Sequence, residues 1–565
     1  MENTIELWSK QTTVKVMRDK TYGAEFKKPA AFCFEAAQNE HESAQIVITP
    51  QKDVSSFKIE LAHVQSDDRM FYIWKDRFTV YFQKYIRVST SSPDAEKHGN
   101  PPGYYPDALL PFEKAVEYGE NKIAAGNNQA IFISLSVPAG QHPGTYSGEF
   151  LLTIDGEIIP IPVKITVWDF EVSRIVHCKS DFVIGSNGLR TGENDYFPDM
   201  YRKYVEKLIE FRLAPHRVMQ FLNRPYNEGA DFVREVRYFT APDKPDLSTI
   251  MLPVYPHPTT GIDEPDFKKH ALALANACVE DGVNYFEKAA VYCGFIDEPQ
   301  HNGNWDEVNR VCKRFEELKE ETADEFVASV PKTEFAAAVA NSLRVVPNYV
   351  TIHFDERIKE VKNWCPGLAH MATKEAREKY RAAAKGGKNW WYQCGVSATT
   401  PNYGIDHNLI DARLMMWMTY DYGLEGTLYW ETVQYFRWYF CLESHVNHEV
   451  AIDCYEEPIR CSHDNGDGYL FYPGKPYGIY GPVESIRLHA IRDGFEEYEY
   501  LYLLEDLCKK TGRDFRAETS ALFSRLYDGV VVKADADTFD EVRRELAEKI
   551  VTIKAEAAKG EYGKG

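Results

Sequence analysis

The chain has 565 residues, of which 44% are hydrophobic, 27% charged and 13% aromatic. This composition is typical of a folded globular protein with about two to four domains, and it excludes fibrous and wholly disordered classes. Acidic residues outnumber basic ones by 86 to 65, which gives a formal net charge of -21. Such a charge repels phosphate backbones and anionic lipid, so we expect no nucleic-acid partner.

Targeting signals and cofactor motifs are absent from the sequence. No run of about 18 apolar residues occurs, so we expect no membrane span. The N-terminus lacks the basic start and apolar stretch of a secretion signal. This predicts a cytoplasmic protein, or a secreted or periplasmic one if a signal was removed. The 11 cysteines form no C-x-x-C pair, so we expect buried thiols, no metal and no cofactor.

Residues 1–172 are predicted to form an N-terminal β-sandwich domain. Short alternating runs of apolar residues, such as 44–48 and 158–167, are separated by turns, for example at 142–149. Alternation of this kind, repeated between turns, is typical of strands in a sandwich. No long helical pattern interrupts the region.

Residues 173–510 are predicted to form a catalytic (β/α)8 barrel of the TIM type. Apolar runs here alternate with amphipathic stretches of helical period, in about eight units. The expected strands are 181–186, 217–221, 249–255, 290–296, 326–330, 349–354, 390–394 and 427–430. The expected helices between them include 200–211, 266–281, 305–320, 374–384 and 409–422.

The end of the chain departs from the barrel rhythm. A turn-rich insert at 443–480 precedes a predicted helix at 485–507. Residues 511–565 are predicted to be a C-terminal helical extension, with two helices within 514–559. The predicted fold class is therefore multidomain α and β, with a sandwich, a barrel and extra helices.

Two adjacent carboxylates end the fourth predicted strand. Asp297 and Glu298 follow an apolar run and precede Pro299, which cannot continue a strand ladder. In a barrel, the carboxyl ends of strands carry the functional groups. A carboxylate pair there suits glycoside hydrolysis, but conventional pairs are separated across the sugar. Adjacency instead suits substrate assistance, in which Asp297 orients the sugar's 2-acetamido group and Glu298 protonates the leaving oxygen.

Aromatic residues at other predicted strand ends are candidates for sugar binding. Rings stack on sugar faces, and tyrosine hydroxyls supply hydrogen bonds. The alternative, that these rings belong to the barrel core, stays open. The candidates for substrate contact are Tyr292, Trp390, Trp391, Tyr392, Trp430 and Glu431, with Asn187, Tyr255 and His257 as weaker ones in loops after strands one and three.

The chain resembles glycoside hydrolase family 123. The resemblance is carried by 39–45 and 105–111 in the sandwich, by 296–299, 390–394 and 428–431 in the barrel, and above all by 467–474, 484–488 and 491–501. It implies a sandwich joined to a barrel, and removal of terminal β-linked N-acetylgalactosamine from glycans such as those of glycosphingolipids. Residue by residue, the family's adjacent catalytic pair corresponds to Asp297 and Glu298.

Two other functions remain open from the sequence. One is a glycosidase for a sugar without the acetamido group, using Glu298 with Glu431 or another carboxylate at the same rim in a conventional double displacement. The other is a carbohydrate-binding protein without turnover. The expected partner is in each case a glycan or oligosaccharide, and the sandwich is a candidate surface for a homodimer. The sequence does not determine whether a galacto or a gluco sugar is preferred.

Overall fold

The structure is a computed structural model, and it describes residues 5–93, 95–219, 229–254, 256–257, 260–299, 305–395, 400–441, 446–458, 460–461 and 464–562. The chain divides into two compact units. Unit 1 comprises 1–174, 395–417 and 435–565, and unit 2 comprises 175–394 and 418–434. Helix α10 (Leu409–Asp421) therefore runs from one unit into the other.

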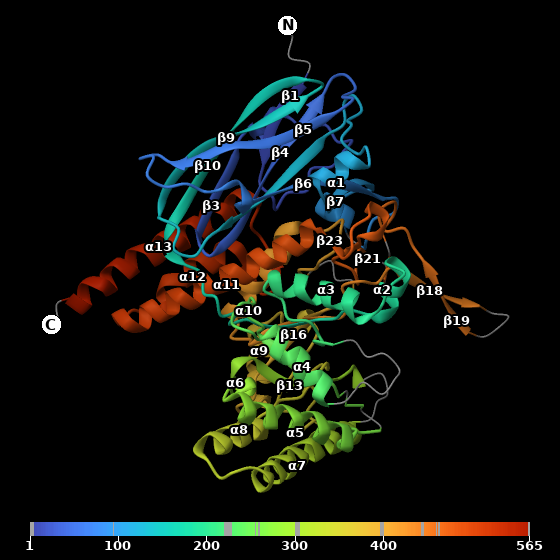
Figure 1. Cartoon of the computed structure of the whole chain (residues 1–565), viewed down its shortest axis with the longest axis vertical. Helices are drawn as coiled ribbons and strands as arrows, with labels where there is room; N and C mark the ends of the chain where they lie inside the picture. The colour runs from blue at the N-terminus through green and yellow to red at the C-terminus, as the bar shows by residue number, and fades with distance from the viewer. Residues whose placement is uncertain are drawn as a thin grey trace. The chain divides into compact units, whose positions relative to one another are not determined.

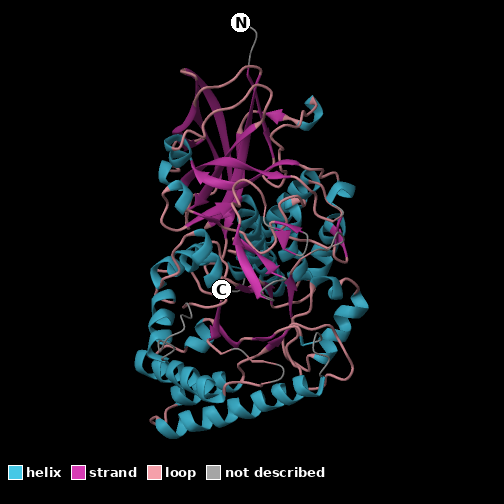
Figure 2. Ribbon diagram, turned by 90° about the vertical axis from the view of Figure 1, so that its right-hand side faces the viewer, coloured by secondary structure: helices cyan, strands magenta, loops and turns pink. Residues whose placement is uncertain are grey.

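The N-terminal part of unit 1 consists of two sheets, as the sequence predicts (Figures 1 and 2). An eight-stranded sheet has the order β2-β1-β4-β8-β6-β7-β23-β22, and a four-stranded sheet the order β3-β10-β9-β5. The strands of this part are β1 Ile5–Lys10, β2 Lys28–Pro29, β3 Phe32–Gln38, β4 Glu40–Pro50, β5 Phe57–Ser66, β6 Phe78–Val88, β7 Gly103–Pro111, β8 Gln129–Val137, β9 Gly144–Ile154 and β10 Glu157–Glu171.

Alternating burial explains why these segments are strands. In β10 every second residue from Ile161 to Val167 is buried, while the residues between them are partly or fully exposed. This period of two places one row of side chains in the core. Rings from the two sheets meet there: Phe34 of β3 contacts Phe78 of β6, and Phe57 of β5 stacks on Phe82 of β6.

The C-terminal part of the chain also belongs to unit 1. Strand β23 pairs with β7 through Glu484↔Leu109 and so extends the N-terminal sheet. This differs from the expected domains 173–510 and 511–565, because 395–417 and 435–510 pack with the sandwich. Helix α1 (Phe112–Glu117) follows β7 in the N-terminal part. The elements of the C-terminal part are β18 Phe436–Cys441, β19 Val446–Ala451, β20 Arg460–Cys461, β21 Asp464–Asn465, β22 Tyr472–Pro473, β23 Pro482–Ser485, α11 Ile486–Thr511, α12 Phe515–Leu526, β24 Tyr527–Asp528, β25 Val531–Val532 and α13 Ala536–Tyr562.

A fully buried arginine joins the distant segments of unit 1. Arg487, in the first turn of α11, pairs with Asp107 of β7 at 2.8 Å, and neither side chain is exposed. The guanidinium also donates to the carbonyl oxygens of Tyr403, Gly466 and Tyr469 at 2.7 to 2.9 Å. One side chain thus holds β7, α11 and two loops in a single arrangement.

Unit 2 alternates short strands with helices. Its elements are β11 Lys179–Phe182, α2 Ser186–Gly192, α3 Pro198–Glu210, α4 Gly229–Phe239, β12 Thr249–Leu252, α5 Glu264–Asp281, α6 Tyr285–Lys288, β13 Ala290–Cys293, β14 Phe295–Ile296, α7 Trp305–Ser329, α8 Glu334–Arg344, β15 Tyr349–Val350, α9 Lys374–Ala383, β16 Trp390–Gln393 and β17 Gly426–Tyr429. The helices expected at 200–211, 266–281 and 374–384 are confirmed within about two residues.

The strands of unit 2 pair in parallel, but the described strands do not form one closed sheet. They form the groups β11-β17-β16, β12-β13 and β14-β15. The prediction of a strand at 326–330 is wrong, because residues 326–329 are the end of helix α7 and residue 330 follows it directly. Strand β14 instead pairs directly with β15, and an extended segment, 364–367, lies between β15 and β16, because it bridges to Val350 and to Tyr392 in parallel. A similar bridge joins Phe182 to Pro215.

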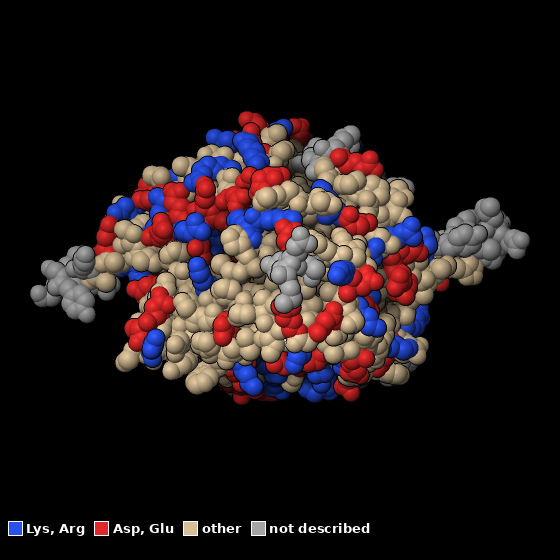
Figure 3. Space-filling model, turned by 90° about the horizontal axis from the view of Figure 1, so that it is seen from above, with Lys and Arg blue, Asp and Glu red and all other residues tan. Residues whose placement is uncertain are grey.

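Helix hydropathy and surface charge describe how the molecule meets its surroundings. Among the described residues, no helix is both long and apolar enough to cross a bilayer. The face seen in Figure 3 carries acidic and basic side chains interspersed with uncharged ones.

Loss of the Asp107 carboxylate should destabilise unit 1 strongly. Asp107→Asn keeps the size of the side chain but leaves the Arg487 guanidinium buried without its counter-charge, and we expect the free energy of unfolding to fall by about 3 to 5 kcal/mol. Chemical unfolding followed by fluorescence measures this change. As a control, Glu117→Ala removes an exposed ion pair with Lys114 and should change stability by less than about 1 kcal/mol. Equal effects from the two substitutions would contradict the role of the buried pair.

Candidate active site

The predicted carboxylate pair lies where strand β14 ends. Ile296 is the last residue of the strand, and Asp297 and Glu298 follow it directly. Glu298 has a φ of +35°, a backbone conformation that residues other than glycine rarely adopt. The strand has therefore ended before the pair, as the sequence predicts, and the backbone turns sharply at the second carboxylate. Asp297 is exposed, whereas Glu298 is partly buried.

Thr351 connects the two acidic residues. Its hydroxyl donates to Asp297 Oδ1 at 2.9 Å and accepts from the backbone N–H of Glu298 at 2.7 Å. Thr351 follows strand β15, the parallel neighbour of β14, and is only 1% exposed. A single buried hydroxyl therefore fixes both the direction of the Asp297 carboxylate and the turn at Glu298. The sequence analysis did not single out this threonine.

Tyr392 reaches Glu298 from the end of β16. Its hydroxyl donates to Glu298 Oε1 at 2.8 Å. Burial, followed by the hydrogen bond and the negative charge of Glu298, holds the pKa of Tyr392 well above its usual value. Tyr392 is thus a neutral donor at any physiological pH and orients one oxygen of the carboxylate.

Two histidines lie near Tyr392. The rings of His353 and His370 are 5.8 Å apart. Burial, with a smaller effect of His353, lowers the pKa of His370, so this imidazole is neutral at pH 7. A Cβ added at Gly367 would lie 3.6 Å from Tyr392 Cζ and 3.7 Å from His370 Cδ2, so both side chains lie directly beside this glycine.

Glu431, at the end of β17, is held by the backbone. Its Oε1 accepts from the N–H groups of Gly185, Thr432 and Val433 at 2.9 to 3.0 Å. A Cβ on Gly185 would come within 2.2 Å of Glu431 Oε2, so a larger residue there would displace the carboxylate from its present position. The side chain is 8% exposed, and burial raises its pKa to about 7 against the opposing effect of the backbone donors.

A buried polar group lies among the strands of unit 2. Asp181 of β11 accepts from His216 Nδ1 at 2.8 Å and from the Tyr292 hydroxyl. Asp181 is completely buried and Tyr292 is 1% exposed. The structure therefore places Tyr292 in the interior, as a donor to Asp181. Asp181 and His216 were missed by the sequence analysis, which offered no signal beyond a polar residue within an apolar run.

The two tryptophans of β16 are also interior. Trp390 packs with Tyr292, Phe295 and Tyr349, and it is 1% exposed. Trp391 is completely buried, and its indole N–H donates to Thr419 at 3.0 Å. Neither ring is exposed to solvent, and Trp390 lines a cavity only at the opposite strand ends. Of the described aromatic candidates, Tyr392 and Trp430 are partly exposed.

The loop candidates have mixed positions. Asn187 is exposed in the first turn of α2. It follows Gly185, whose backbone N–H donates to Glu431, by two residues. His257 is exposed, and its backbone pairs with Gly261 in a tight turn. Tyr255 lies outside the described residues. Tyr392, one of the predicted substrate-binding residues, contacts the carboxylate pair directly through its hydrogen bond to Glu298.

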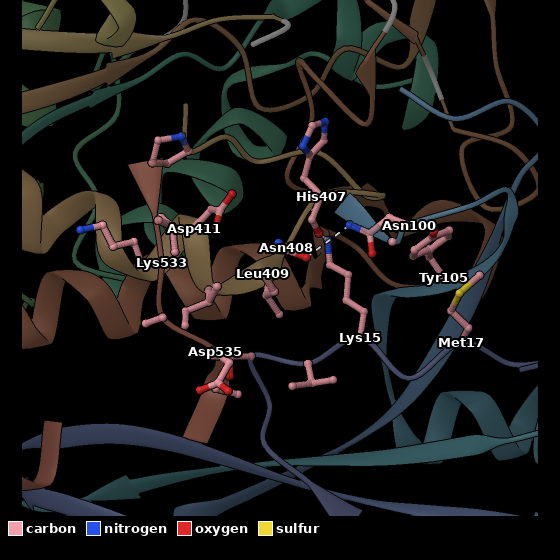
Figure 4. Close-up of a pocket in the computed structure, with 18 of the residues that line it drawn as sticks. Lys15, Met17, Asn100, Tyr105, His407, Asn408, Leu409, Asp411, Lys533 and Asp535 are labelled. Atoms are coloured by element: carbon pink, nitrogen blue, oxygen red, sulfur yellow. Dashed lines mark hydrogen bonds between the residues drawn. The ribbon is translucent and has the colours of Figure 1, made fainter. Parts of the chain in front are cut away.

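Two cavities in the described part of the chain lie away from the carboxylate pair. In unit 2, a cavity of about 740 Å³ is lined by Ala290, Tyr349 and Trp390, which begin their strands, so it lies at the strand ends opposite the pair. In unit 1, another cavity of about 740 Å³ contains Lys15 and Asp411 (Figure 4). Lys15 donates there to the carbonyls of 404, 405 and 407 at 2.8 to 3.0 Å, so its ammonium holds a loop in place.

The arrangement around Glu298 can perform acid–base chemistry. An exposed carboxylate and a partly buried one lie next to each other, each fixed by a hydroxyl, with a neutral histidine nearby. A fixed, partly desolvated carboxyl group is suited to proton transfer, and an exposed one to holding a polar or positively charged group.

Comparison with known families gives two matches, which cover separate ranges of the chain. The sequence model of the glycoside hydrolase 123 N-terminal domain matches residues 20–154, and that of the glycoside hydrolase 123 catalytic domain matches residues 307–504. The catalytic match begins after Asp297 and Glu298. Comparison with curated proteins gives no match.

Comparison with solved structures agrees. A family 123 glycoside hydrolase from Clostridium perfringens, studied for glycolipid glycan hydrolysis, is 14% identical, with a TM-score of 0.66 over 98% of this chain and 99% of that chain. A β-glucuronidase from Parabacteroides merdae is 11% identical over 76% of this chain and 47% of that chain, with a TM-score of 0.25. At this identity the first likeness establishes the shared fold, and the second carries no argument. From the two family matches, the chain belongs to glycoside hydrolase family 123.

Proposed function

We propose that the protein is an exo-acting, retaining glycoside hydrolase that removes terminal β-linked N-acetylgalactosamine by substrate assistance. The observation that carries the proposal is the shared contact of Asp297 and Glu298 with Thr351, which fixes two adjacent carboxylates at one strand end. The C. perfringens relative, which hydrolyses glycolipid glycans, supports a glycan of that kind as substrate. The parallel segments of unit 2 are compatible with a barrel-type catalytic unit in this proposal.

The first step forms a cyclic intermediate. Glu298, protonated, gives its proton to the glycosidic oxygen as the bond to C1 breaks, and the 2-acetamido carbonyl oxygen attacks C1 from the opposite face. Asp297 accepts a hydrogen bond from the acetamido N–H and stabilises the positive charge that develops on the forming oxazolinium ring. Tyr392, which donates to Glu298 Oε1, orients the carboxyl group throughout.

The second step restores the enzyme. The Glu298 carboxylate takes a proton from water as the water oxygen attacks C1 and the C1–O bond of the ring breaks. The acetamido group is regenerated and Glu298 is protonated again. Two inversions at C1 leave the configuration of the sugar unchanged.

The contacts of Glu431 argue against its use as a nucleophile. One of its oxygens already accepts three backbone N–H groups, and Gly185 lies against the other. A nucleophile needs an ionised oxygen directed at C1, whereas burial keeps a large share of Glu431 protonated near pH 7. We therefore assign Glu431 the role of joining the ends of β17 and β11, and the double-displacement alternative is the weaker one.

Substitution of the two acidic residues should have different effects. Glu298→Gln should lower kcat/KM by about 10² to 10⁴-fold on an alkyl β-N-acetylgalactosaminide, because proton donation to a poor leaving group is lost. On the 2,4-dinitrophenyl glycoside its effect on bond cleavage should be much smaller. Asp297→Asn should slow both substrates similarly, because acetamido participation does not depend on the leaving group. Steady-state kinetics on the two substrates measures the difference.

Controls for this prediction use the sugar itself. The 4-nitrophenyl β-glycosides of N-acetylgalactosamine and galactose differ in the acetamido group, and only the first should be cleaved. A thiazoline analogue of the N-acetylhexosamine should inhibit strongly. Full activity of either variant on the alkyl glycoside would disprove the assignment of the pair. Cleavage of the galactoside with no thiazoline inhibition would favour double displacement, and sugar binding without any turnover would favour a binding protein.

Thr351 should act as a positioning residue. Thr351→Val removes the hydroxyl but keeps the shape, so the Asp297 carboxylate loses its donor and we expect kcat to fall by about 10-fold or more on the acetamido substrate, with KM changing less. Thr351→Ser retains the hydroxyl and should keep most of the activity. If valine and serine behave alike, the hydroxyl does not orient Asp297.

Glu431 should contribute to the pH dependence of stability without being essential for catalysis. Its folded-state pKa of about 7 exceeds the value of about 4.3 in an unfolded chain, so the folded state binds more protons between these values and stability falls as the pH rises from about 4 to 7. Glu431→Gln keeps an oxygen acceptor without the charge. We expect it to reduce this loss, which has an upper limit of about 4 kcal/mol.

Unfolding midpoints of Glu431→Gln and the unmodified protein at pH 5 and pH 8 test the stability claim. The same variant separates the two catalytic proposals, because under substrate assistance kcat should change by less than about 10-fold, whereas loss of a nucleophile would abolish turnover. A fully inactive but folded variant would restore the double-displacement alternative.

A further inference from the structure

An exposed group of large apolar side chains lies on the connection between β5 and β6 in unit 1. Met70, Phe71, Tyr72 and Trp74 are 72%, 36%, 47% and 68% exposed, and we call these four residues the aromatic tip. Single exposed apolar residues are common, but a contiguous group of this size on one short connection marks an interaction surface. It belongs to the unit that does not contain Asp297 and Glu298.

The backbone under the aromatic tip is fixed. The Ser66 hydroxyl accepts from the N–H groups of Met70 and Phe71 at 3.1 and 2.9 Å, and the Ser66 N–H donates to the Phe71 carbonyl at 2.8 Å. Ile73, within the same segment, points into the core and is 3% exposed. The neighbouring side chains are therefore held outward by a regular turn, so binding to them would order little additional chain.

The rings of the aromatic tip are paired. Tyr72 stacks on Trp74 with 5.6 Å between centroids and 21° between planes. Phe71 stacks on His142 at 4.0 Å and 11°. Each pair holds its rings parallel, and the high exposure of Trp74 leaves most of the indole open to solvent. Rigid aromatic surfaces of this kind provide large contact areas at low entropic cost.

The charges around the aromatic tip are balanced. The exposed charged residues beside it comprise three acidic and three basic side chains, namely Asp67, Asp68, Arg69, Lys75, Asp76 and Arg77. Contact with an anionic bilayer needs an excess of basic residues, and the chain as a whole carries -21. A balanced set instead favours an uncharged ligand with many hydrogen-bonding groups. Hydrogen bonds from Thr145 and Ser66 hold the pKa values of Asp67 and Asp68 below their usual range, so both carboxylates remain acceptors.

We propose that the aromatic tip is a glycan-binding surface, carried by the unit that does not contain the candidate active site. Sugar rings stack on Trp74 and Tyr72 through their apolar faces, and their hydroxyl groups bond to the charged side chains around the rings. The surface recognises an uncharged, hydroxyl-rich glycan chain. It holds a polymeric or clustered glycan without taking part in bond cleavage, and the inference does not depend on which sugar is hydrolysed.

Native gel electrophoresis in gels containing desialylated mucin, a densely glycosylated protein from which the charged sialic acids have been removed, tests the proposal. The full chain carries Glu298→Gln to prevent turnover, and it is compared with the same chain that also carries Tyr72→Ala and Trp74→Ala. Mucin should retard the first protein, and loss of two stacking rings should weaken its apparent affinity by about 10-fold. Trp74→Phe keeps a ring and should retain part of the retardation.

The matched control is Ile158→Ala, which removes a 62% exposed apolar side chain from β10 of the same unit. It should leave the retardation unchanged, and thermal unfolding should show that all variants are folded. Equal retardation of the Tyr72/Trp74 variant and the Ile158 variant would overturn the proposal, as would no retardation of the parent chain.

Two further measurements test other occupants of the aromatic tip. Sedimentation with phosphatidylcholine vesicles that depends on Trp74 would show a membrane contact and overturn the proposal. Sedimentation velocity showing a dimer that is lost in the Tyr72/Trp74 variant would show self-association and overturn it too. Cleavage of a small nitrophenyl glycoside by the chain with an intact Glu298 should be unaffected by Trp74→Ala, so failure of the glycan surface is distinguishable from failure of the proposed hydrolase.

Discussion

The organisation of unit 1 depends on the burial of one guanidinium. Arg487 is fully buried, and its donors meet the Asp107 carboxylate and the carbonyls of Tyr403, Gly466 and Tyr469. Desolvating a charge is tolerated only when nearly all of its hydrogen bonds are made, so these four segments must come together or the arginine cannot be buried. This requirement explains why 395–417 and 435–565 fold with the N-terminal sheets. Residues 484–488, which carry part of the family resemblance, contain this arginine.

The sequence predicted local elements better than it predicted which elements pack together. Amphipathic periodicity identified α3, α5 and α9, and alternation identified β10, because both patterns are set by which side of an element is buried. The strand expected at 326–330 failed because a short apolar run fits a strand or the buried side of a helix equally well, and Phe326 is on the buried side of α7. The extended segment at 364–367 was missed because Pro366 and Gly367 interrupt any alternation.

The candidate site was predictable where chemistry is concentrated in adjacent residues. Asp297 and Glu298 were recognised because two charges end an apolar run. Thr351 and Asp181 were not, since their importance comes from partners on neighbouring strands, 53 residues away for Thr351 and Glu298. The sequence could not show whether Trp390 lies in the interior or at the substrate-binding edge. A parallel strand that is covered on both faces is apolar along its whole length, so its pattern does not indicate where each ring points.

The turn at Glu298 explains how adjacent residues can serve one site. In a regular strand, Asp297 and Glu298 would point to opposite faces. The φ of +35° interrupts the alternation, at a cost of roughly 1 to 3 kcal/mol that the bonds from Glu298 to Thr351 and from Tyr392 offset. Under the proposed function this strain has a chemical reason. The leaving oxygen is attached to C1 and the acetamido nitrogen to C2, which are neighbouring ring carbons. Protein groups that act on both atoms must therefore lie close together. A conventional pair must instead flank the sugar from two faces, which residues on separate strands do better.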